Sequence, residues 1–349
     1  MRKLRVGFGL WLALAAVLPA QVMHRDLNDG KKKIRSIVLM PVVVNLIRIS
    51  MKGAEPMNQE SRNHELPLAL EIEAALQERG YRLDRKALSR EALAKDPEER
   101  YAVDDLQKRF DAELDLIRHK SKDVRKGRFG IGDNVARLPL KDDVDALLFV
   151  RARGQILTGN KKAFRSVVAG VNGDATVLNF GIVDARTGEM LYFSKSKLRV
   201  AMTGQPDDIA EGIAKAFARL PQGHTAVPAA TAVPDVASAA DSAGPVGRIV
   251  LSQKVVERHL AKYVRPEYPG VATMNGVEGD VILHYVIDRN GRVSQTMGVL
   301  GPVQLNPAAT SAVMQWRYRP FVIDGQVYEV EAQTTLSFRL GAEPPPHAE

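Results

Sequence analysis

The sequence predicts an α+β protein with two folded domains: an N-terminal α/β domain in which helices flank a mixed sheet, and a small C-terminal domain built on an antiparallel sheet. Its 349 residues exceed an ordinary single domain of about 150 residues. Residues 223–247 are mostly Ala, Val, Pro, Ser and Gly without periodicity, which is typical of a flexible linker. Strand-like and helix-like segments alternate before this linker, and a clear period of two dominates after it.

The first 20 residues have the layout of a secretory signal. A basic start at 1–5 is followed by a nearly uninterrupted apolar stretch at 6–18 and by a cleavable sequence that ends at Ala20. The apolar stretch is shorter than the roughly 20 residues that a membrane-spanning helix needs. We therefore expect export to the periplasm with removal of residues 1–20. The alternative is an uncleaved anchor that holds the chain at the inner membrane through residues 6–19.

Residues 32–222 have the pattern of an α/β domain. The apolar, β-branched stretch 34–44 predicts one strand that is buried on both faces. Further elements are predicted as helices at 65–79, within 86–120 and at 206–220, and as strands at 145–157, 175–183 and 190–198. In this order of elements, the segment is similar to the α/β domains at the N-terminus of TolB and in CsgG-like proteins.

No motif in the sequence predicts catalysis, a cofactor or a metal site. The chain has no cysteine, and its 7 histidines are scattered without metal-ligand spacing. The glycine-rich stretch 154–161 lacks the Ser or Thr that follows the lysine of a phosphate loop, and 127–132 lacks a preceding strand. We therefore expect a binding protein rather than an enzyme.

The formal net charge of +8 favours acidic partners. Basic residues gather at 118–128, where they could contact anionic lipid or peptidoglycan, or form a solvated loop. Nucleic acid is disfavoured, because aromatic residues are not interleaved with the basic ones and the chain carries an export signal.

The C-terminal third contains the densest motifs. Alternating apolar residues at 281–287 and turn residues that end in Gly291 predict a hairpin. A helix is predicted from Pro307 through Trp316, with Pro320 as its stop. The final strand, 327–340, alternates strictly between apolar and polar residues, so one of its faces belongs to the core.

Together these motifs resemble the C-terminal domain of TonB-family proteins over about residues 255–341. We place this domain at 248–341, with a disordered tail at 342–349. The resemblance implies a three-stranded antiparallel sheet with two helices. The positions that carry it are Gly279, Gly291, Leu305, Trp316, Tyr318 and Pro320.

The resemblance also implies a mode of binding. Similar domains bind an extended segment of an outer-membrane protein, which adds as a strand to an exposed sheet edge. Carried over to this sequence, the partner-binding residues are Arg265, Glu267, Tyr268, Pro269, Val327, Glu329, Glu331, Gln333 and Thr335.

Two questions about the role of the chain stay open at this stage. Energy-transducing TonB proteins carry a His in an uncleaved membrane helix, and residues 6–18 contain none. An energy transducer for transport is one expectation, and the missing His counts against it. An envelope assembly scaffold whose N-terminal domain recognises the partner is the other. A homodimer is compatible with both.

Overall fold

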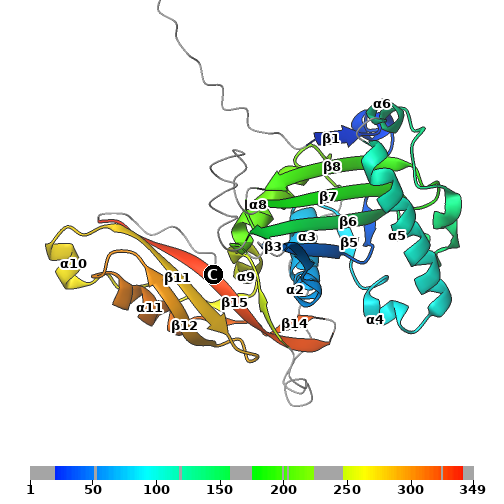
Figure 1. Cartoon of the computed structure of the whole chain (residues 1–349). Helices are drawn as coiled ribbons and strands as arrows, with labels where there is room; N and C mark the ends of the chain where they lie inside the picture. The colour runs from blue at the N-terminus through cyan, green and yellow to red at the C-terminus, as the bar shows by residue number, and fades with distance from the viewer. Residues whose placement is uncertain are drawn as a thin grey trace, which may run out of the picture.

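Two larger sheets organise the chain in the computed structural model (Figure 1). The structure describes residues 20–50, 53–117, 120–157, 175–198, 200–202, 204–223, 247–323 and 325–340. Residues 1–19 of the predicted signal, most of the predicted linker and the predicted tail lie outside these residues, whereas Ala20, the last residue of the predicted signal, is described. Among the helices of the described residues, none is both long and apolar enough to cross a membrane.

The N-terminal domain contains an eight-stranded mixed sheet in the order β1-β8-β7-β6-β2-β5; β3 also pairs with β6, and β4 pairs with β3. Its strands are β1 (Ala20–Met23), β2 (Ser36–Leu39), β3 (Val43–Ser50), β4 (Gly53–Pro56), β5 (Arg82–Asp84), β6 (Ala146–Leu157), β7 (Ala175–Asp184) and β8 (Met190–Leu198). Strand β1 pairs with β8, so the sheet takes in residues that precede the expected start at 32.

The single strand expected at 34–44 is wrong, because the structure forms β2 and β3 there. Pro41 lies between them and has no N–H to donate to a ladder. Strand β2 pairs in parallel with the first part of β6, and β3 pairs in parallel with its second part. The two short strands therefore cover one side of the longer β6.

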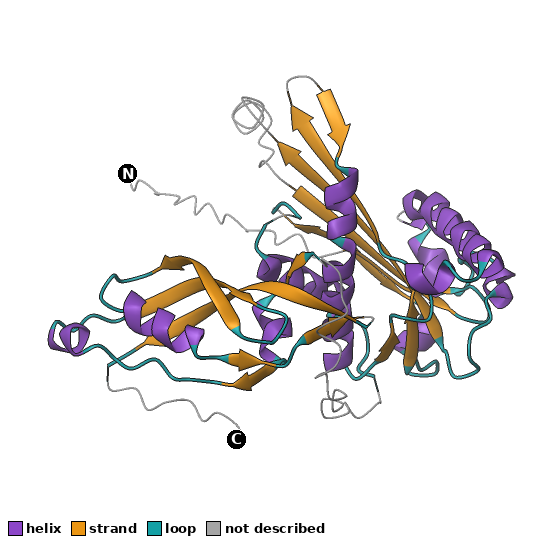
Figure 2. Cartoon of the chain, turned by 90° about the horizontal axis from the view of Figure 1, so that it is seen from below, coloured by secondary structure: helices purple, strands orange, loops and turns teal. Residues whose placement is uncertain are grey.

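Helices cover both faces of this sheet (Figure 2). Within β6, Leu148 and Val150 join a core with α3 and α8, whereas Leu147 and Phe149 join a second core with α5. This alternation explains why β6 is buried on both faces. The helices of the domain are α1 (Arg25–Asn28), α2 (Asn58–Asn63), α3 (Glu65–Glu78), α4 (Arg90–Leu93), α5 (Pro97–Ile117), α6 (Ser121–Arg125), the short 3₁₀ helix η1 (Asp133–Arg137) and α8 (Pro206–Phe217).

The C-terminal domain contains a five-stranded sheet in the order β12-β11-β15-β14, with β9 also paired to β15. The expected antiparallel core of three strands is present as β12, β11 and β15, and the short strands β9 and β14 extend it. In the described part of this domain, three helices accompany the sheet instead of two. The elements are β9 (Arg248–Val250), α9 (Gln253–Glu257), β10 (Leu260–Lys262), α10 (Gly270–Met274), β11 (Gly279–Ile287), β12 (Val293–Leu300), α11 (Asn306–Met314), β13 (Arg317–Tyr318), β14 (Phe321–Ile323) and β15 (Gln326–Phe338).

Trp316 anchors the core of the C-terminal domain. Its side chain is 4% exposed, and its indole N–H donates to the carbonyl of Val264 over 2.8 Å. Close by, the hydroxyls of Tyr285 and Tyr318 share a buried hydrogen bond of 2.7 Å. Helix α11 ends at Met314, earlier than expected, because the next residues pair with β10 as strand β13. The expected stop at Pro320 is therefore wrong.

Helix α3 belongs to both domains. Leu68, Ile72 and Leu76 lie in the N-terminal core, on the face that packs against the sheet. Ala74 lies in the C-terminal core, and Leu66 and Leu70 pack against that same core. The two domains are therefore in contact through α3, although the residues before Gly247 connect them as a predicted linker.

Candidate partner-binding edge

Strand β15 is paired along the whole of one side and along part of the other. On the first side it pairs with β11 and, near its start, with β14. On the second side β9 pairs in parallel with residues 329–331, and the N–H of Leu251 donates to the carbonyl of Glu331 over 3.1 Å. Within the described part of the chain, no strand pairs with this second side at residues 333–337. We call residues 333–337 the open edge.

The backbone of the open edge can accept another strand. Because Glu331 bonds toward β9, the alternation of a β-ladder turns the N–H and C=O of Gln333, Thr335 and Ser337 toward the same side. The intervening Thr334 and Leu336 are buried, as the alternating sequence predicted. The edge therefore combines outward backbone groups with a well-packed inner face.

Charged side chains lie at both ends of the unpaired stretch. At one end, Arg248 of β9 forms an ion pair of 3.3 Å with Glu329. At the other, Asp280 accepts hydrogen bonds from Ser337 at 2.7 Å and from Arg339 at 2.8 Å. Hydrogen bonds from these two side chains lower the pKa of Asp280, which therefore stays ionised at neutral pH.

The segment before α10 passes over the inner face of the sheet. The ring of Tyr268 meets Phe338 at the end of β15, with 5.6 Å between ring centroids, and its hydroxyl donates to the carbonyl of Val277 over 2.7 Å. Pro269 caps the start of α10. Arg265 and Glu267 are exposed on this segment. The ring of Tyr268 thus packs against the last residue of β15, close to the open edge.

The nine residues predicted to bind a partner fall into different environments. Gln333 and Thr335 lie on the open edge, but Glu329 and Glu331 are covered by β9. Val327 is 3% exposed and pairs with β14. The free stretch is therefore shorter than the predicted one. Sequence reasoning missed the role of β9, which is only three residues long and directly follows the predicted linker.

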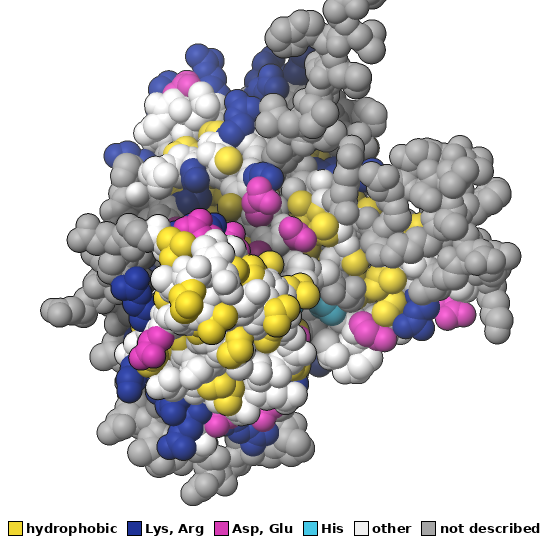
Figure 3. Space-filling model, turned by 90° about the vertical axis from the view of Figure 1, so that its left-hand side faces the viewer, with side chains coloured by type: hydrophobic (Ala, Val, Ile, Leu, Met, Phe, Trp, Pro, Cys, Tyr) yellow, Lys and Arg dark blue, Asp and Glu magenta, His cyan; other side chains and the backbone are white. Residues whose placement is uncertain are grey.

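An exposed apolar surface lies beside the far end of the open edge. Figure 3 views the C-terminal domain from this end and shows hydrophobic side chains gathered there. Met274 of α10 is 87% exposed, and Val303, after β12, is 79% exposed. Gly279, which pairs with the last residue of β15, lies against Pro302. The surface is therefore continuous with the end of β15. We call it the apolar tip, and it comprises Val271, Met274, Leu300 and Val303.

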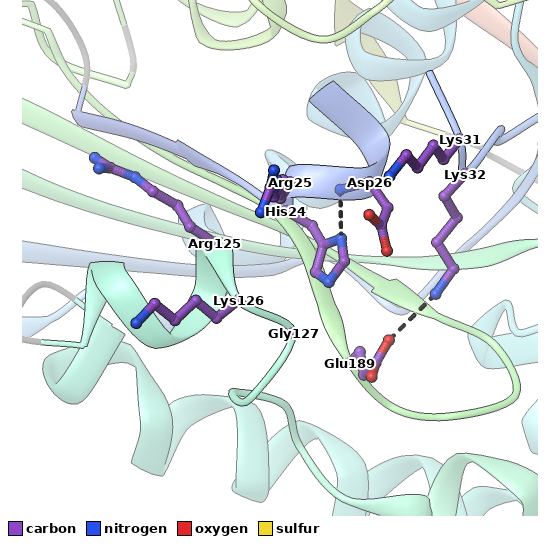
Figure 4. A pocket seen from close by; sticks show the side chains of 9 residues that line it. All are labelled: His24, Arg25, Asp26, Lys31, Lys32, Arg125, Lys126, Gly127 and Glu189. Carbon is purple, nitrogen blue, oxygen red and sulfur yellow. Dashed lines mark hydrogen bonds and ion pairs between the residues drawn. The ribbon is translucent and has the colours of Figure 1, made fainter. Parts of the chain in front are cut away.

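A basic pocket lies in the N-terminal domain, far along the chain from this edge (Figure 4). Its volume is about 520 Å³, and it joins α1, α6 and the loop before β2. The lining residues are His24, Arg25, Asp26, Lys31, Lys32, Arg125, Lys126, Gly127 and Glu189. Part of the basic stretch 118–128 thus meets three basic residues from 25–32, which the sequence did not connect. Arg118 and His119 lie outside the described residues.

Lys32, one of the lysines that line the pocket, forms ion pairs with two carboxylates. Lys32 contacts Asp184 at 2.7 Å and Glu189 at 3.2 Å. Burial alone lowers the pKa of Lys32, but these two carboxylates outweigh it and raise the pKa above the usual value. No group of three His, Asp or Glu in the described ranges is arranged to hold a metal ion.

Comparisons with known proteins assign the C-terminal domain. Residues 264–340 match the family described as Gram-negative bacterial TonB protein C-terminal. Protein TonB of Vibrio cholerae is 29% identical over 83 residues, which is 23% of this chain and 34% of that protein. The chain thus spans about a third of the length of this curated relative.

Two kinds of solved structure are also similar. The C-terminal domain of Pseudomonas aeruginosa TonB matches with a TM-score of 0.21 and 23% identity, over 24% of this chain and 88% of that one. The PelC dodecamer of Paraburkholderia phytofirmans matches with a TM-score of 0.26 and 10% identity, over 59% of this chain and 98% of that one. By sequence, residues 264–340 belong with the TonB C-terminal domain, and this part of the chain is distantly similar to TonB.

Proposed function

We propose that this protein works in the cell envelope, where its C-terminal domain binds an extended segment of an outer-membrane or other envelope protein by strand addition. The observation that carries this proposal is the unpaired side of β15 at residues 333–337, in a domain of the TonB family. A row of outward N–H and C=O groups provides affinity for any extended chain, and neighbouring side chains provide selectivity.

The surroundings of the open edge support a partner of mixed character. The apolar tip lies beyond the end of β15 and offers Met274 and Val303 to apolar side chains of the partner. The segment before α10 packs near the end of β15, and Arg265 and Glu267 are exposed on it. They provide one positive and one negative charge for contact with the partner. The partner segment therefore runs along residues 333–337 and ends against the apolar tip.

A proline substitution tests the proposal. The N–H of Thr335 points outward, so Thr335→Pro removes a donor from the open edge but keeps the ladder to β11. The control is Thr335→Ala, which changes the side chain and keeps the N–H. We expect outer-membrane proteins from detergent extracts to be retained by immobilised wild-type chain and by Thr335→Ala, and to be lost with Thr335→Pro. Equal retention by the proline variant, with unchanged circular dichroism, contradicts strand addition.

The transducer and scaffold roles differ in which domain recognises the partner. If the chain couples energy to transport, deleting residues 248–349 abolishes uptake of a ligand that needs an outer-membrane transporter. If it is an assembly scaffold, the same deletion leaves the recognition of its partner by the N-terminal domain intact. The TonB family assignment of residues 264–340 favours the first role.

The basic pocket supports a second, separate activity: contact with anionic phospholipid. Arg25, Lys31, Arg125 and Lys126 are exposed around it and add up to a local excess of positive charge. Each basic residue close to an anionic membrane surface contributes about 1 kcal/mol of attraction. The pocket also lies shortly after the predicted signal or anchor, at a point where the chain is near the membrane if the anchor is retained.

Vesicle binding tests this second activity. The variant Arg125→Glu/Lys126→Glu is expected to bind phosphatidylglycerol vesicles more than about 30-fold more weakly than the wild type, because it loses two contacts of about 1 kcal/mol each and adds two charges that the anionic surface repels. Lys95→Glu, an exposed lysine outside the pocket, is the matched control. Binding that is unchanged in the double variant, or equal on neutral phosphatidylcholine vesicles, contradicts the proposal. Binding to isolated peptidoglycan but not to vesicles also contradicts it, and indicates that the basic pocket contacts the cell wall instead of phospholipid.

A further inference from the structure

Strand β9 lies on the same side of β15 that the proposed partner strand needs. It pairs in parallel with residues 329–331, directly before the open edge in β15. Ile249 is 7% exposed and belongs to the C-terminal core, whereas Val250 is 43% exposed. Arg248 faces Glu329 in an ion pair of 3.3 Å. The chain thus supplies its own short strand at a position where an added strand would lie.

This strand is short and gains little from pairing alone. It contains three residues, and the hydrogen bond from Leu251 to Glu331 closes its end. A net hydrogen bond in water contributes modestly, because the unpaired groups bond to water instead. A longer partner strand that pairs with residues 329–337 makes more bonds than β9 does. By backbone pairing alone, a partner strand therefore displaces β9 from this edge. Further contacts are needed to keep β9 in place.

Helix α9 provides that additional hold, shortly after β9 and Leu251. The backbone N–H of Ser252 donates to Glu71 over 2.9 Å, and its hydroxyl donates to the other oxygen of the same carboxylate over 2.7 Å. Glu71 is on α3 and is 6% exposed, and Ser252 is 1% exposed. The N–H of Gln253 donates to Asp207 of α8 over 2.9 Å. The N-terminal domain thus binds the start of α9 through two carboxylates.

A second, more exposed contact strengthens the same attachment. Glu78 of α3 pairs with both Lys254 and Arg258. Arg258 also donates to the carbonyl of Ala74 over 3.2 Å. Both ends of α9 are therefore bound to the N-terminal domain, and α9 in turn holds β9 in place.

We propose that β9 is an internal occupant of the binding edge, and that a partner strand reaches full contact by displacing β9 and thereby withdrawing Ser252 from Glu71. This inference rests on the proposed function for the existence of an outside partner. The partner segment that fits this surface resembles β9 in chemistry, with a basic residue opposite Glu329 and an aliphatic residue over Val330. Docking of the two domains and binding of the partner therefore oppose each other, by the same free energy in both directions.

The absence of cysteine in the chain makes a direct test simple. Val250 and Glu331 are register neighbours in β9 and β15, so Val250→Cys/Glu331→Cys introduces one disulfide that fixes β9 on the edge. Glu71→Ala removes the acceptor for Ser252, and Glu71→Gln keeps an acceptor oxygen as the matched control. The probe is a fluorescent synthetic peptide with the sequence of residues 247–253, added to the full-length chain and followed by polarisation.

The expected outcomes separate displacement from simple addition. The oxidised disulfide variant binds at least tenfold more weakly than the same protein after reduction, which controls for folding within one polypeptide. Glu71→Ala binds the peptide at least tenfold more tightly than the wild type, and Glu71→Gln lies near the wild type. Equal binding by all variants, including no binding by any, overturns the inference. The peptide assay uses no envelope protein, so its failure is distinct from a failure to retain an outer-membrane partner.

Discussion

Replacing Trp316 by Phe is the most quantitative test of the C-terminal core. The indole N–H bonds to the carbonyl of Val264, and losing a hydrogen bond of this kind costs about 1 kcal/mol. The side chain is 4% exposed and packs against the rings of Tyr263, Tyr285 and Tyr318, so the smaller ring leaves a gap worth about 1 to 2 kcal/mol. We expect a total loss of about 2 to 3 kcal/mol.

Hydrogen exchange in β11 measures this loss, because its amides exchange when the C-terminal domain opens. A loss of 2 kcal/mol speeds exchange about 30-fold at 1.4 kcal/mol per factor of ten. Trp316→Ala is expected to cost more, about 3 to 5 kcal/mol. Val303→Ala, at a position that is 79% exposed, changes exchange less than threefold and serves as the control. Exchange in Trp316→Phe that matches this control refutes the assignment of Trp316 as the anchor.

Three further predictions concern packing and protonation. Gly291→Ala destabilises the C-terminal domain by more than about 2 kcal/mol in the same exchange assay, because its φ is +75° and a Cβ there lies 1.9 Å from the carbonyl oxygen of Tyr318. Tyr318→Phe leaves the buried hydroxyl of Tyr285 without its 2.7 Å partner, which costs about 1 to 2 kcal/mol in urea unfolding. Burial raises the pKa of Glu71 and of Asp207 above the usual 4.5 and 3.8, so the folded chain binds these protons more tightly than the unfolded chain. The contribution of these two carboxyls to stability therefore rises as the pH falls from neutral toward 4.5, whereas His259, whose pKa burial lowers to about 4, contributes in the opposite direction. Glu71→Gln removes the contribution of Glu71, so stability in urea unfolding at a series of pH values depends on pH differently in the variant and in the wild type; an unchanged pH dependence in the variant contradicts the assignment to Glu71.

The C-terminal domain was predictable because its signals are local. In β15 the residues of one face alternate with those of the other along the whole strand, and burial follows that alternation at Val330, Ala332 and Thr334. The turn at Gly291 and the burial of Trp316 also follow from residue types at fixed spacing. Three strands of the sheet therefore emerge from sequence patterns that span fewer than 20 residues each.

Features that depend on distant residues were not predictable. Nothing in the three residues of β9 specifies that they pair with residues 329–331, about 80 positions later along the chain. The end of α11 depends on the pairing of β13 with β10, which overrides the helical spacing up to Trp316. The basic pocket combines Lys31 with Lys126, which lie far apart in the sequence and come together where α6 packs beside β1 and β8.

A separated N-terminal domain is expected to be prone to association, because α3 carries a second apolar face. Leu66, Leu70 and Ala74 pack against the C-terminal core, and the carboxylate of Glu71 lies among them. A chain cut after Gly223 presents this stripe to water beside an acidic group whose hydrogen-bond donors have left. Association with another molecule would bury this stripe again and is therefore favourable. Proteolysis between the domains is thus expected to expose an apolar surface that promotes association.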